Sequence, residues 1–337
     1  LIEILEKYKQ PIYSISGLNG AINIYIQYVK NNNIHYTKAI EFIQWKYSDK
    51  KKSLTPLNYF INNYDSIIVS GMQKNTSMKI FSNLNFKIIN PINIYVLPLK
   101  LSYKNLLIDK NINENEIQIW LNKIYSNYKN NNILNKSDDI NLLDNLFYLW
   151  NLFSIKHNLI SYYKNKDFFQ WKLNNAYYTY NINGNLNDGY IIWREEETYT
   201  SSMGIRIVDI IPGKDAINNK THFDLFISKF INFCINQNYE VIDFYCTSNI
   251  LETHLFNNHF KLKNNKNIGD TSISIYFKTN KAFSSRNMGI FIKDMTLFNT
   301  NTIYFTKWME ELDPPRCRFC KKAFCSKLYT NIKCNEK

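Results

Sequence analysis

Few side chains in the sequence combine a reactive type with a position that could serve proton transfer. Asp209 lies inside the apolar run 204–211, which predicts a central strand that ends at Pro212. A carboxylate there could accept a proton from an amine or a hydroxyl group. Asp209 is therefore the first candidate for a catalytic base, and a strand-edge carboxylate without a catalytic role is the competing interpretation. The acidic run 195–197 could attract a cation, but a charge run after a strand is usually a solvated turn.

Three histidines are candidates for proton transfer because imidazole titrates near neutral pH. The pattern places His222 in the first turn of a helix, His254 within a helix and His259 just before a strand. The sequence shows no carboxylate partner for any of them. We therefore expect surface or packing roles for all three.

The cysteines fall into two groups. Cys234 and Cys246 lie in apolar patterns and are expected to be buried free thiols. The others form a C-x2-C-x4-C-x8-C series in a basic tail: Cys317, Cys320, Cys325 and Cys334. A zinc site usually has two C-x2-C pairs and this tail has one, so we expect no bound metal. The sequence also lacks G-x-S-x-G, H-E-x-x-H, P-loop and G-x-G-x-x-G motifs, which leaves common hydrolase, metalloprotease and nucleotide-binding classes unsupported.

Length and composition predict a folded protein of about two domains. The chain has 337 residues, of which 45% are hydrophobic, so it can bury a core. No apolar run reaches the ~18 residues that a membrane span needs. The first residues lack the layout of a signal peptide, so we expect a soluble cytoplasmic protein.

The net charge of +13 is weak support for nucleic-acid binding. Lysine provides most of it, whereas arginine supplies the forked contacts preferred by bases and phosphates. The only arginines are Arg194, Arg206, Arg286, Arg316 and Arg318. An excess of Asn, Ile, Lys and Tyr is typical of an AT-rich genome, so codon bias explains much of the charge.

The pattern predicts two α/β segments separated by a helical, asparagine-rich middle. In the first segment it predicts helices at 21–30 and 37–47, a strand at 65–70, a helix capped by Asn75 or Thr76, and strands at 86–89 and 94–97. The middle carries helices at 114–125 and 140–153, and 128–136 is the best linker.

The second segment begins with a predicted hairpin, whose strands 177–182 and 189–194 are joined through 183–185. After the central strand, Thr221 and Asp224 are spaced as a capping box for the next helix. A strand at 241–245, a helix from Asn249 and strands at 260–262 and 271–277 follow. Strands that alternate with helices in this way predict a mixed sheet flanked by helices.

The two segments contain an internal repeat. Asn75 and Asn249 each begin a predicted helix after an apolar strand, and each precedes a phenylalanine by 11 residues, Phe86 and Phe260. A second similarity relates the stretches 41–47 and 167–173, around Trp45 and Trp171, although the interval from the tryptophan to the phenylalanine differs between the two segments. We predict two related strand-helix-strand units.

These motifs resemble the GNAT (GCN5-related) N-acetyltransferases. The Asn-led helix and the strand beginning at Phe are similar to the family's N-x-x-A-x-x-L-Y-x-x-x-G-F pattern. The stretch 163–173, with Phe169, Trp171 and Lys172, is similar to the R-x-x-x-Y-L-x-W-R-Y/F segment of tandem GNAT proteins from bacterial polysaccharide gene clusters. The stretches 302–306 and 313–316 loosely match their closing strand and acidic tail.

The resemblance implies an α/β (α+β) protein with two GNAT-like units. The expected parts are a shortened unit at 1–100, a helical linker at 101–160, an acyltransferase unit at 161–310 and a basic cysteine-containing tail at 311–337.

The resemblance also implies acyl-CoA binding beside two splayed parallel strands. Backbone groups of a bulged strand, here Val208 and Ile210, would hold the pantetheine arm, and amides at Gly213, Lys214 and Asp215 would hold the pyrophosphate. Asn249 could bond to the cofactor, although a helix cap is sufficient explanation for it. In this family an acid often stands where Asp209 does.

Two features depart from the family pattern. The R/Q-x-x-G-x-G/A loop is absent, since only Gly213 lies in the region, and the family's general-acid tyrosine is replaced by Leu255 and Phe81. The implied function is transfer of an acyl group from acetyl-CoA or another acyl-CoA to an amino sugar or a similar polysaccharide precursor. The alternatives are a FemABX-like transferase that uses aminoacyl-tRNA, and a degenerate tandem domain that acts as a binding or scaffold protein.

Overall fold

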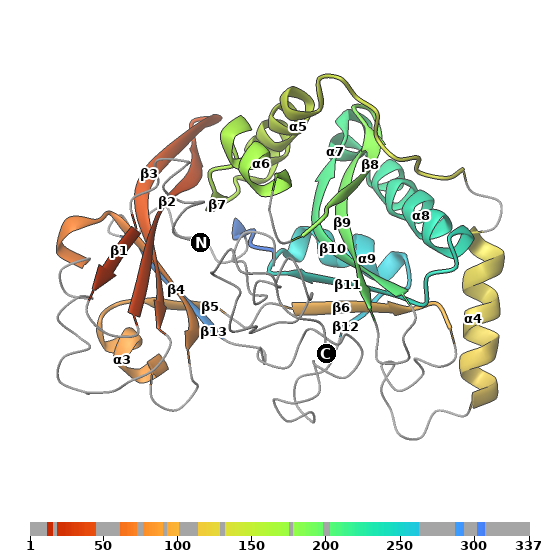
Figure 1. The fold of residues 1–337 in the computed structure, drawn as a ribbon, viewed down its shortest axis with the longest axis horizontal. Helices are drawn as coiled ribbons and strands as arrows, with labels where there is room; N and C mark the ends of the chain where they lie inside the picture. The colour runs from red at the N-terminus through yellow and green to blue at the C-terminus, as the bar shows by residue number, and fades with distance from the viewer. Residues whose placement is uncertain are drawn as a thin grey trace, which may run out of the picture. The chain divides into compact units, whose positions relative to one another are not determined.

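The computed structural model describes residues 12–15, 19–44, 61–72, 77–89, 93–100, 114–128, 132–174, 178–197, 203–262, 287–292 and 302–306. Contacts between Cα atoms divide the chain into two compact units. Unit 1 comprises residues 1–92, 157–163 and 286–305, and unit 2 comprises 93–156, 164–285 and 306–337. Both units hold a mixed β-sheet with helices (Figure 1).

The sheet of unit 1 has the strand order β1-β2-β3-β4-β13-β5, and β7 pairs with β2 outside this path. The strands are β1 (Ile12–Ile15), β2 (Asn19–Lys30), β3 (Asn33–Gln44), β4 (Ser66–Met72), β5 (Lys87–Ile89), β7 (Ser161–Tyr162) and β13 (Asn287–Ile292). Helix α3 (Ser77–Asn83) joins β4 to β5. Buried apolar side chains on this framework include Ile26, Ala39, Ile67, Ile68, Phe81 and Phe86.

The helices predicted at 21–30 and 37–47 are wrong: the described part of these stretches forms the hairpin β2–β3. Ile22, Ile24 and Ile26 recur at every second residue, which is the period of a half-buried strand. The turn consists of Asn31 and Asn32, with φ of 51° and 58°. Asparagine tolerates this left-handed conformation, and two such residues make the tight turn that matches strand twist.

The sheet of unit 2 has the order β12-β6-β11-β10-β9-β8. Its strands are β6 (Asn93–Pro98), β8 (Asn181–Asn185), β9 (Gly189–Glu197), β10 (Met203–Pro212), β11 (Val241–Cys246) and β12 (Lys261–Leu262). The helices of this unit are α4 (Glu114–Tyr128), α5 (Leu142–His157, whose last residue groups with unit 1), α6 (Lys166–Leu173), α7 (Lys214–Asn218), α8 (Lys220–Asn236) and α9 (Asn249–Asn257). Trp193 of β9 lies against Phe230 and Phe233 of α8, so α8 covers one face of the sheet.

Each sheet contains a strand from the other half of the sequence. β6 follows β5 along the chain but pairs with β11 and β12, and β13 pairs with β4 and β5 (Figure 1). The two strand orders then correspond: an antiparallel hairpin, a parallel central pair, a strand from the other half of the chain and a short last strand.

Most other predicted elements of unit 2 are present, with two local corrections. The segment 183–185 belongs to β8 rather than to the turn, which is formed by residues 186–188. The predicted capping box of Thr221 and Asp224 is wrong, because Asn219 caps α8 by accepting from the amides of Thr221 and His222.

Several predictions concern residues outside the described ones, including Trp45, the caps Asn75 and Thr76, the strand at 271–277 and the tail at 311–337. The predicted boundaries at 100 and 160 remain predictions; in the structure, residues 93–156 group with unit 2. Among the described residues, no helix is both long and apolar enough to cross a membrane.

Candidate functional site

The central strands of unit 2 separate part-way along their length. β10 pairs in parallel with β11 at three positions, the last of which joins Ile207 to Phe244. Beyond this point β10 continues to Pro212 beside β9, and β11 continues to Cys246 beside β6. A register shift between Ile207 and Asp209 leaves Val208 as the extra residue of a bulge in the β9–β10 pairing. The backbone of β10 after Ile207 therefore turns away from β11.

Unit 1 lacks both features in the corresponding strands. β3 and β4 pair in parallel at five successive positions, and the register of β2 with β3 runs without a break from Asn19 to Lys30. The separated, bulged pair of central strands is thus a property of unit 2.

Asp209 lies at this bulge and is fully buried inside the sheet, so it is not a strand-edge carboxylate. Its Oδ2 accepts from Lys164 Nζ at 2.5 Å, and its Oδ1 accepts from the amide of Ile210 at 3.0 Å. Lys164 Nζ also lies 3.7 Å from the centre of the Trp150 ring of α5. Burial lowers the pKa of Lys164 to about 8, although Asp209 acts in the opposite direction. The sequence prediction missed Lys164, which is 45 residues from Asp209; it lies in the stretch 163–173 that resembles tandem GNAT proteins, but that resemblance gave it no role.

The same face of the sheet buries two further ion pairs. Arg206 makes a forked contact to Asp243, with its Nη2 2.7 Å from Oδ2, and Arg194 Nε lies 2.8 Å from Glu196 Oε1. Arg206 and Arg194 stand opposite each other in the β9–β10 register, and Asp209 stands opposite Ile192, two residues from Arg194. Alternation along a strand therefore puts all these side chains on one face. Every buried cation of this group has an anionic partner, as buried charges require.

A second polar cluster lies on the opposite face, at the same end of β11. Tyr95 stands opposite Phe244, and its Oη donates to Glu252 Oε2 of α9 at 2.7 Å. Asn93 Nδ2 lies 3.2 Å from Tyr95 Oη. Tyr95 is fully buried, whereas Asn93 and Glu252 are partly exposed. Burial, reinforced by Glu252, raises the pKa of the Tyr95 phenol.

Cys246 connects the two clusters electrostatically. Its thiol is buried, accepts from the amide of Ser248 at 3.1 Å, and interacts with both Asp209 and Glu252. Burial raises the pKa of this thiol, so it is neutral at physiological pH. The prediction that Cys234 and Cys246 are buried free thiols is confirmed.

The amides that the resemblance predicts to hold a pyrophosphate already donate hydrogen bonds to the turn between β8 and β9. Each amide donates to a carbonyl of this turn: Gly213 to Asp188 at 3.0 Å, Lys214 to Leu186 at 3.4 Å, and Asp215 to Asn187 at 3.3 Å. Gly213 permits the close approach, because a Cβ atom there would lie 2.1 Å from Asn187 O. The separated strands thus suit a pantetheine arm, whereas these three amides do not suit a pyrophosphate without a change in the turn.

Asn249 does not cap α9, because Ser248 accepts from the amide of Ile250 at 3.2 Å and occupies the cap position. Asn249 is the first residue of α9 and is exposed.

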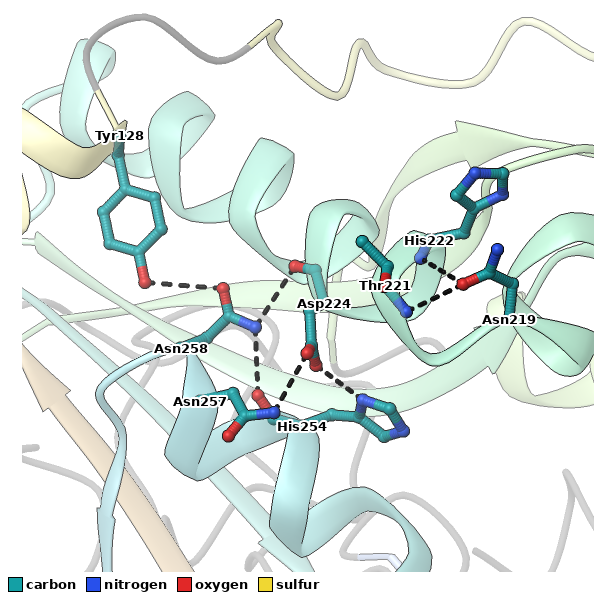
Figure 2. A network of polar contacts seen from close by, with 8 residues as sticks. All are labelled: Tyr128, Asn219, Thr221, His222, Asp224, His254, Asn257 and Asn258. Atoms are coloured by element: carbon teal, nitrogen blue, oxygen red, sulfur yellow. Dashed lines mark hydrogen bonds and ion pairs between the residues drawn. The ribbon is translucent and has the colours of Figure 1, made fainter.

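A separate network joins α4, α8 and α9, and it includes the carboxylate partner that the sequence did not reveal for His254 (Figure 2). Asp224 Oδ1 lies 2.6 Å from His254 Nδ1, and Asp224 Oδ2 accepts from Asn257 Nδ2 at 2.9 Å. The His254 ring stacks on Phe223 at 4.1 Å. Asn258 bonds to the Asp224 carbonyl and to Tyr128. His222 contributes its amide to the Asn219 cap, and its ring is exposed.

His, Cys, Asp and Glu side chains do not gather in groups of three that could hold a metal ion anywhere in the described part of the chain. The four tail cysteines lie outside that part.

Comparisons with known proteins give only distant structural likeness. No family model and no curated protein match the sequence. A GCN5-related N-acetyltransferase from Anabaena variabilis is 7% identical, with a TM-score of 0.45 over 82% of this chain and 60% of that chain. Saccharomyces cerevisiae N-myristoyltransferase with bound myristoyl-CoA is 10% identical, with a TM-score of 0.47 over 81% and 66%.

A probable N-acyltransferase from Enterococcus faecalis is 9% identical, with a TM-score of 0.49 over 88% of this chain and 65% of that chain. This chain therefore spans 60 to 66% of the lengths of these three proteins. Scores at this level carry no inference about activity, which has to rest on the site itself.

Proposed function

We propose that the protein is an acyl-CoA-dependent N-acyltransferase whose activity resides in unit 2. The observation that carries the proposal is the separation of β10 from β11 after Ile207, together with the bulge at Val208. Strands that separate inside a sheet leave backbone donors and acceptors without a strand partner, and an extended pantetheine arm can pair with them as a strand would. The absence of both features from unit 1 supports placing the site in unit 2.

Asp209 is the proposed base. In acyl transfer to an amine, the amine nitrogen attacks the thioester carbonyl and must lose a proton. Asp209 lies at the point where the strands separate. Its ion pair with Lys164, in which Nζ lies 2.5 Å from Oδ2, fixes the orientation of the carboxylate. Val208 and Ile210 would face the arm with their backbone groups. The Ile210 amide at present donates to Asp209, so it would have to exchange that bond for one to the substrate.

The acceptor that we propose is an amino sugar or a similar precursor of a surface polysaccharide, as the resemblance to tandem GNAT proteins implies. The corresponding strand orders of the two sheets support a tandem origin, because duplication of one unit would give the same order twice. The substrate assignment rests on the resemblance alone, since fold does not determine substrate.

A second candidate is a non-catalytic tandem domain that binds a partner. The specific observation in its favour is that the three amides of Gly213, Lys214 and Asp215 already donate to the β8–β9 turn. Leu255 and Phe81 at the positions of the family's tyrosine are also consistent with a lost activity.

Two measurements distinguish the acyltransferase from the non-catalytic binding protein. The first is calorimetric titration with acetyl-CoA, and the second is an assay of thiol release in the presence of glucosamine. We expect binding near the micromolar range, about −8 kcal/mol. In the double variant Lys164→Met/Asp209→Asn, which leaves no unpaired charge, binding should persist while thiol release falls by about 100-fold or more.

The matched control is Lys100→Met/Glu240→Gln, which removes an ion pair at the opposite end of β11 and should change neither quantity. Absence of binding to acetyl-CoA and to longer acyl-CoA thioesters would overturn the proposed acyltransferase activity and favour the non-catalytic binding protein. If tRNA binds instead, with a strong salt dependence, the aminoacyl-tRNA transferase becomes the better interpretation.

A further inference from the structure

We propose that the buried ion pair of Arg206 and Asp243 sets the point at which β10 separates from β11, and that it thereby positions the thioester of the acyl donor relative to Asp209. This inference rests on the proposed acyl transfer and deepens it. Arg206 and Asp243 are positioning residues in this proposal, because they act through the backbone of β10 and do not contact the substrate.

Three rows of paired residues join β10 to β11, and Arg206 and Asp243 form the middle row. The next row, Ile207 and Phe244, is the last one before the strands separate. Parallel pairs are slightly less stable per residue than antiparallel ones, so a ladder of three rows beside a separation should open easily. A fixed point of separation therefore requires an additional contact between the two strands.

The Arg206 side chain provides such a contact. Its Nε lies 2.9 Å from Asp243 Oδ1 and its Nη2 lies 2.7 Å from Asp243 Oδ2, which is the forked geometry of a strong ion pair. Its Nη1 lies 3.5 Å from Glu196 Oε1 of β9. Arg206 and Asp243 are fully buried. One guanidinium group thus connects β9, β10 and β11, which are neighbours in the sheet, directly before the separation (Figure 1).

A second buried ion pair lies beyond the separation, where Asp209 of β10 bonds to Lys164. The two ion pairs of this face therefore flank the point at which the strands separate. Unit 1 provides a comparison, because its parallel strands β3 and β4 pair at five successive positions. None of these five described rows joins two charged residues. The charged row accompanies the separated strands and is not a general feature of parallel pairing in this chain.

The point of separation determines where an acyl donor lies. A pantetheine arm that pairs with Val208 and Ile210 can enter only as far as the last closed row, which fixes the distance from its thioester to Asp209. If the strands separated earlier, the arm could move along β10 by two residues, or about 7 Å, and still find backbone partners. Binding would then persist, whereas a misplacement of about 1 Å can lower the rate about 100-fold.

The test compares two charge-neutral double variants of the full chain. Arg206→Met/Asp243→Val removes the proposed pair. Arg194→Met/Glu196→Met is the matched control, because its ion pair lies within β9 and its removal leaves Arg206 bound to Asp243. Hydrogen exchange followed by mass spectrometry needs no substrate. We expect amides at 205–207 and 241–244 to exchange about 10-fold faster in the first variant and to stay within about twofold in the control.

Acyl transfer from acetyl-CoA is the second measurement, with whichever of glucosamine, galactosamine and lysine gives the fastest thiol release with the wild-type protein. In Arg206→Met/Asp243→Val we expect kcat to fall about 100-fold while the Kd for acetyl-CoA stays within about threefold. The control should retain both values. A loss of folded protein would lower kcat and the number of binding sites together, so a lowered kcat with full binding excludes a purely structural effect.

Arg206→Lys provides a test even if the double variant folds poorly. It keeps the charge but loses the forked contact, so it should lower kcat without changing Kd, to a smaller extent. Unchanged hydrogen exchange, unchanged kcat, or equal changes in the two double variants would overturn the role of Arg206 and Asp243 while the acyl transfer stands. A wild-type protein that binds no acyl-CoA would overturn the acyl transfer itself and the inference with it, whatever the exchange rates are.

Discussion

Lys164 Nζ lies 2.5 Å from Asp209 Oδ2, and both side chains are fully buried. Removing two charges from water costs several kcal/mol per ion, and a close pair recovers this only with good geometry and additional hydrogen bonds. The pair has such support, from the Trp150 ring at 3.7 Å and the Ile210 amide at 3.0 Å. A buried ion pair with this desolvation cost, at a bulge between separated strands, is more typical of a functional site than of a hydrophobic core.

Removing one partner of this pair should be much more harmful than removing both. Lys164→Met or Asp209→Asn leaves one group buried without its partner, and each should lower the free energy of unfolding by about 3 to 5 kcal/mol. The double variant Lys164→Met/Asp209→Asn should recover most of this loss. Urea unfolding followed by circular dichroism measures all three. Additive losses in the double variant would contradict the coupling of the two side chains.

The lowered pKa of Lys164 predicts a specific dependence of stability on pH. Its pKa falls from 10.5 to about 8 on folding, because burial disfavours the charged form. Between these values the unfolded chain binds the proton and the folded chain does not, so stability rises with pH from about 8 towards 10.5 and this contribution is absent below 8. The full contribution is about 3 kcal/mol.

The measurement is the free energy of unfolding of wild type minus that of Lys164→Met, taken from pH 7 to 10. Subtraction removes the contributions of all groups that behave alike in the two proteins. A difference that stays constant over this range would show that Lys164 does not lose its proton in the folded state.

Local patterns predicted many elements of unit 2 but not their partners. The apolar runs of β10 and β11 and the amphipathic face of α8 each lie within about 20 residues, and simple periodicity identifies them. The hairpin β2–β3 was mistaken for two helices because an apolar stretch with few turn signals fits either period, and the alternation of Ile22, Ile24 and Ile26 was the decisive signal.

The candidate site is formed by contacts between residues that are far apart in the sequence. Such contacts leave no local pattern in the sequence. Asp209 can be selected from the sequence because it lies in the predicted central strand, where the family that the chain resembles often has an acid. Lys164 and Tyr95, in contrast, look like ordinary residues of a lysine- and tyrosine-rich chain. Tyr95 reaches Glu252 across 157 residues only because β6 joins the sheet of unit 2. His254 was assigned no partner because Asp224 was interpreted as part of a cap, a role that Asn219 fills.

Gly213 should be required for the packing of the β8–β9 turn. A Cβ atom at this position would lie 2.1 Å from Asn187 O and 2.4 Å from Gly189 N, and backbone atoms cannot move aside as a flexible side chain can. We expect Gly213→Ala to lower the free energy of unfolding by about 1 to 3 kcal/mol. Urea unfolding is the measurement, and Asp215→Ala, an exposed change in the same segment, should cost less than about 1 kcal/mol. Equal effects of the two substitutions would show that the turn can move away from β10, as pyrophosphate binding at these amides would require.

Asp224 should stabilise the contact between α8 and α9. Asp224→Ala removes the bonds to His254 Nδ1 and Asn257 Nδ2 and leaves the buried ring nitrogen of His254 without an acceptor. Because hydrogen bonds to a charged group are worth about 1.5 to 3 kcal/mol, we expect a loss of about 2 kcal/mol in the free energy of unfolding. His222→Ala is the matched control, since this ring is exposed on the same helix, and should cost less than about 0.5 kcal/mol. A double-mutant cycle with His254→Ala should give a coupling energy of about 1 kcal/mol or more between Asp224 and His254. A coupling near zero would show that the short Nδ1–Oδ1 contact contributes nothing to stability, and that the two helices are held by the apolar contacts around Phe223.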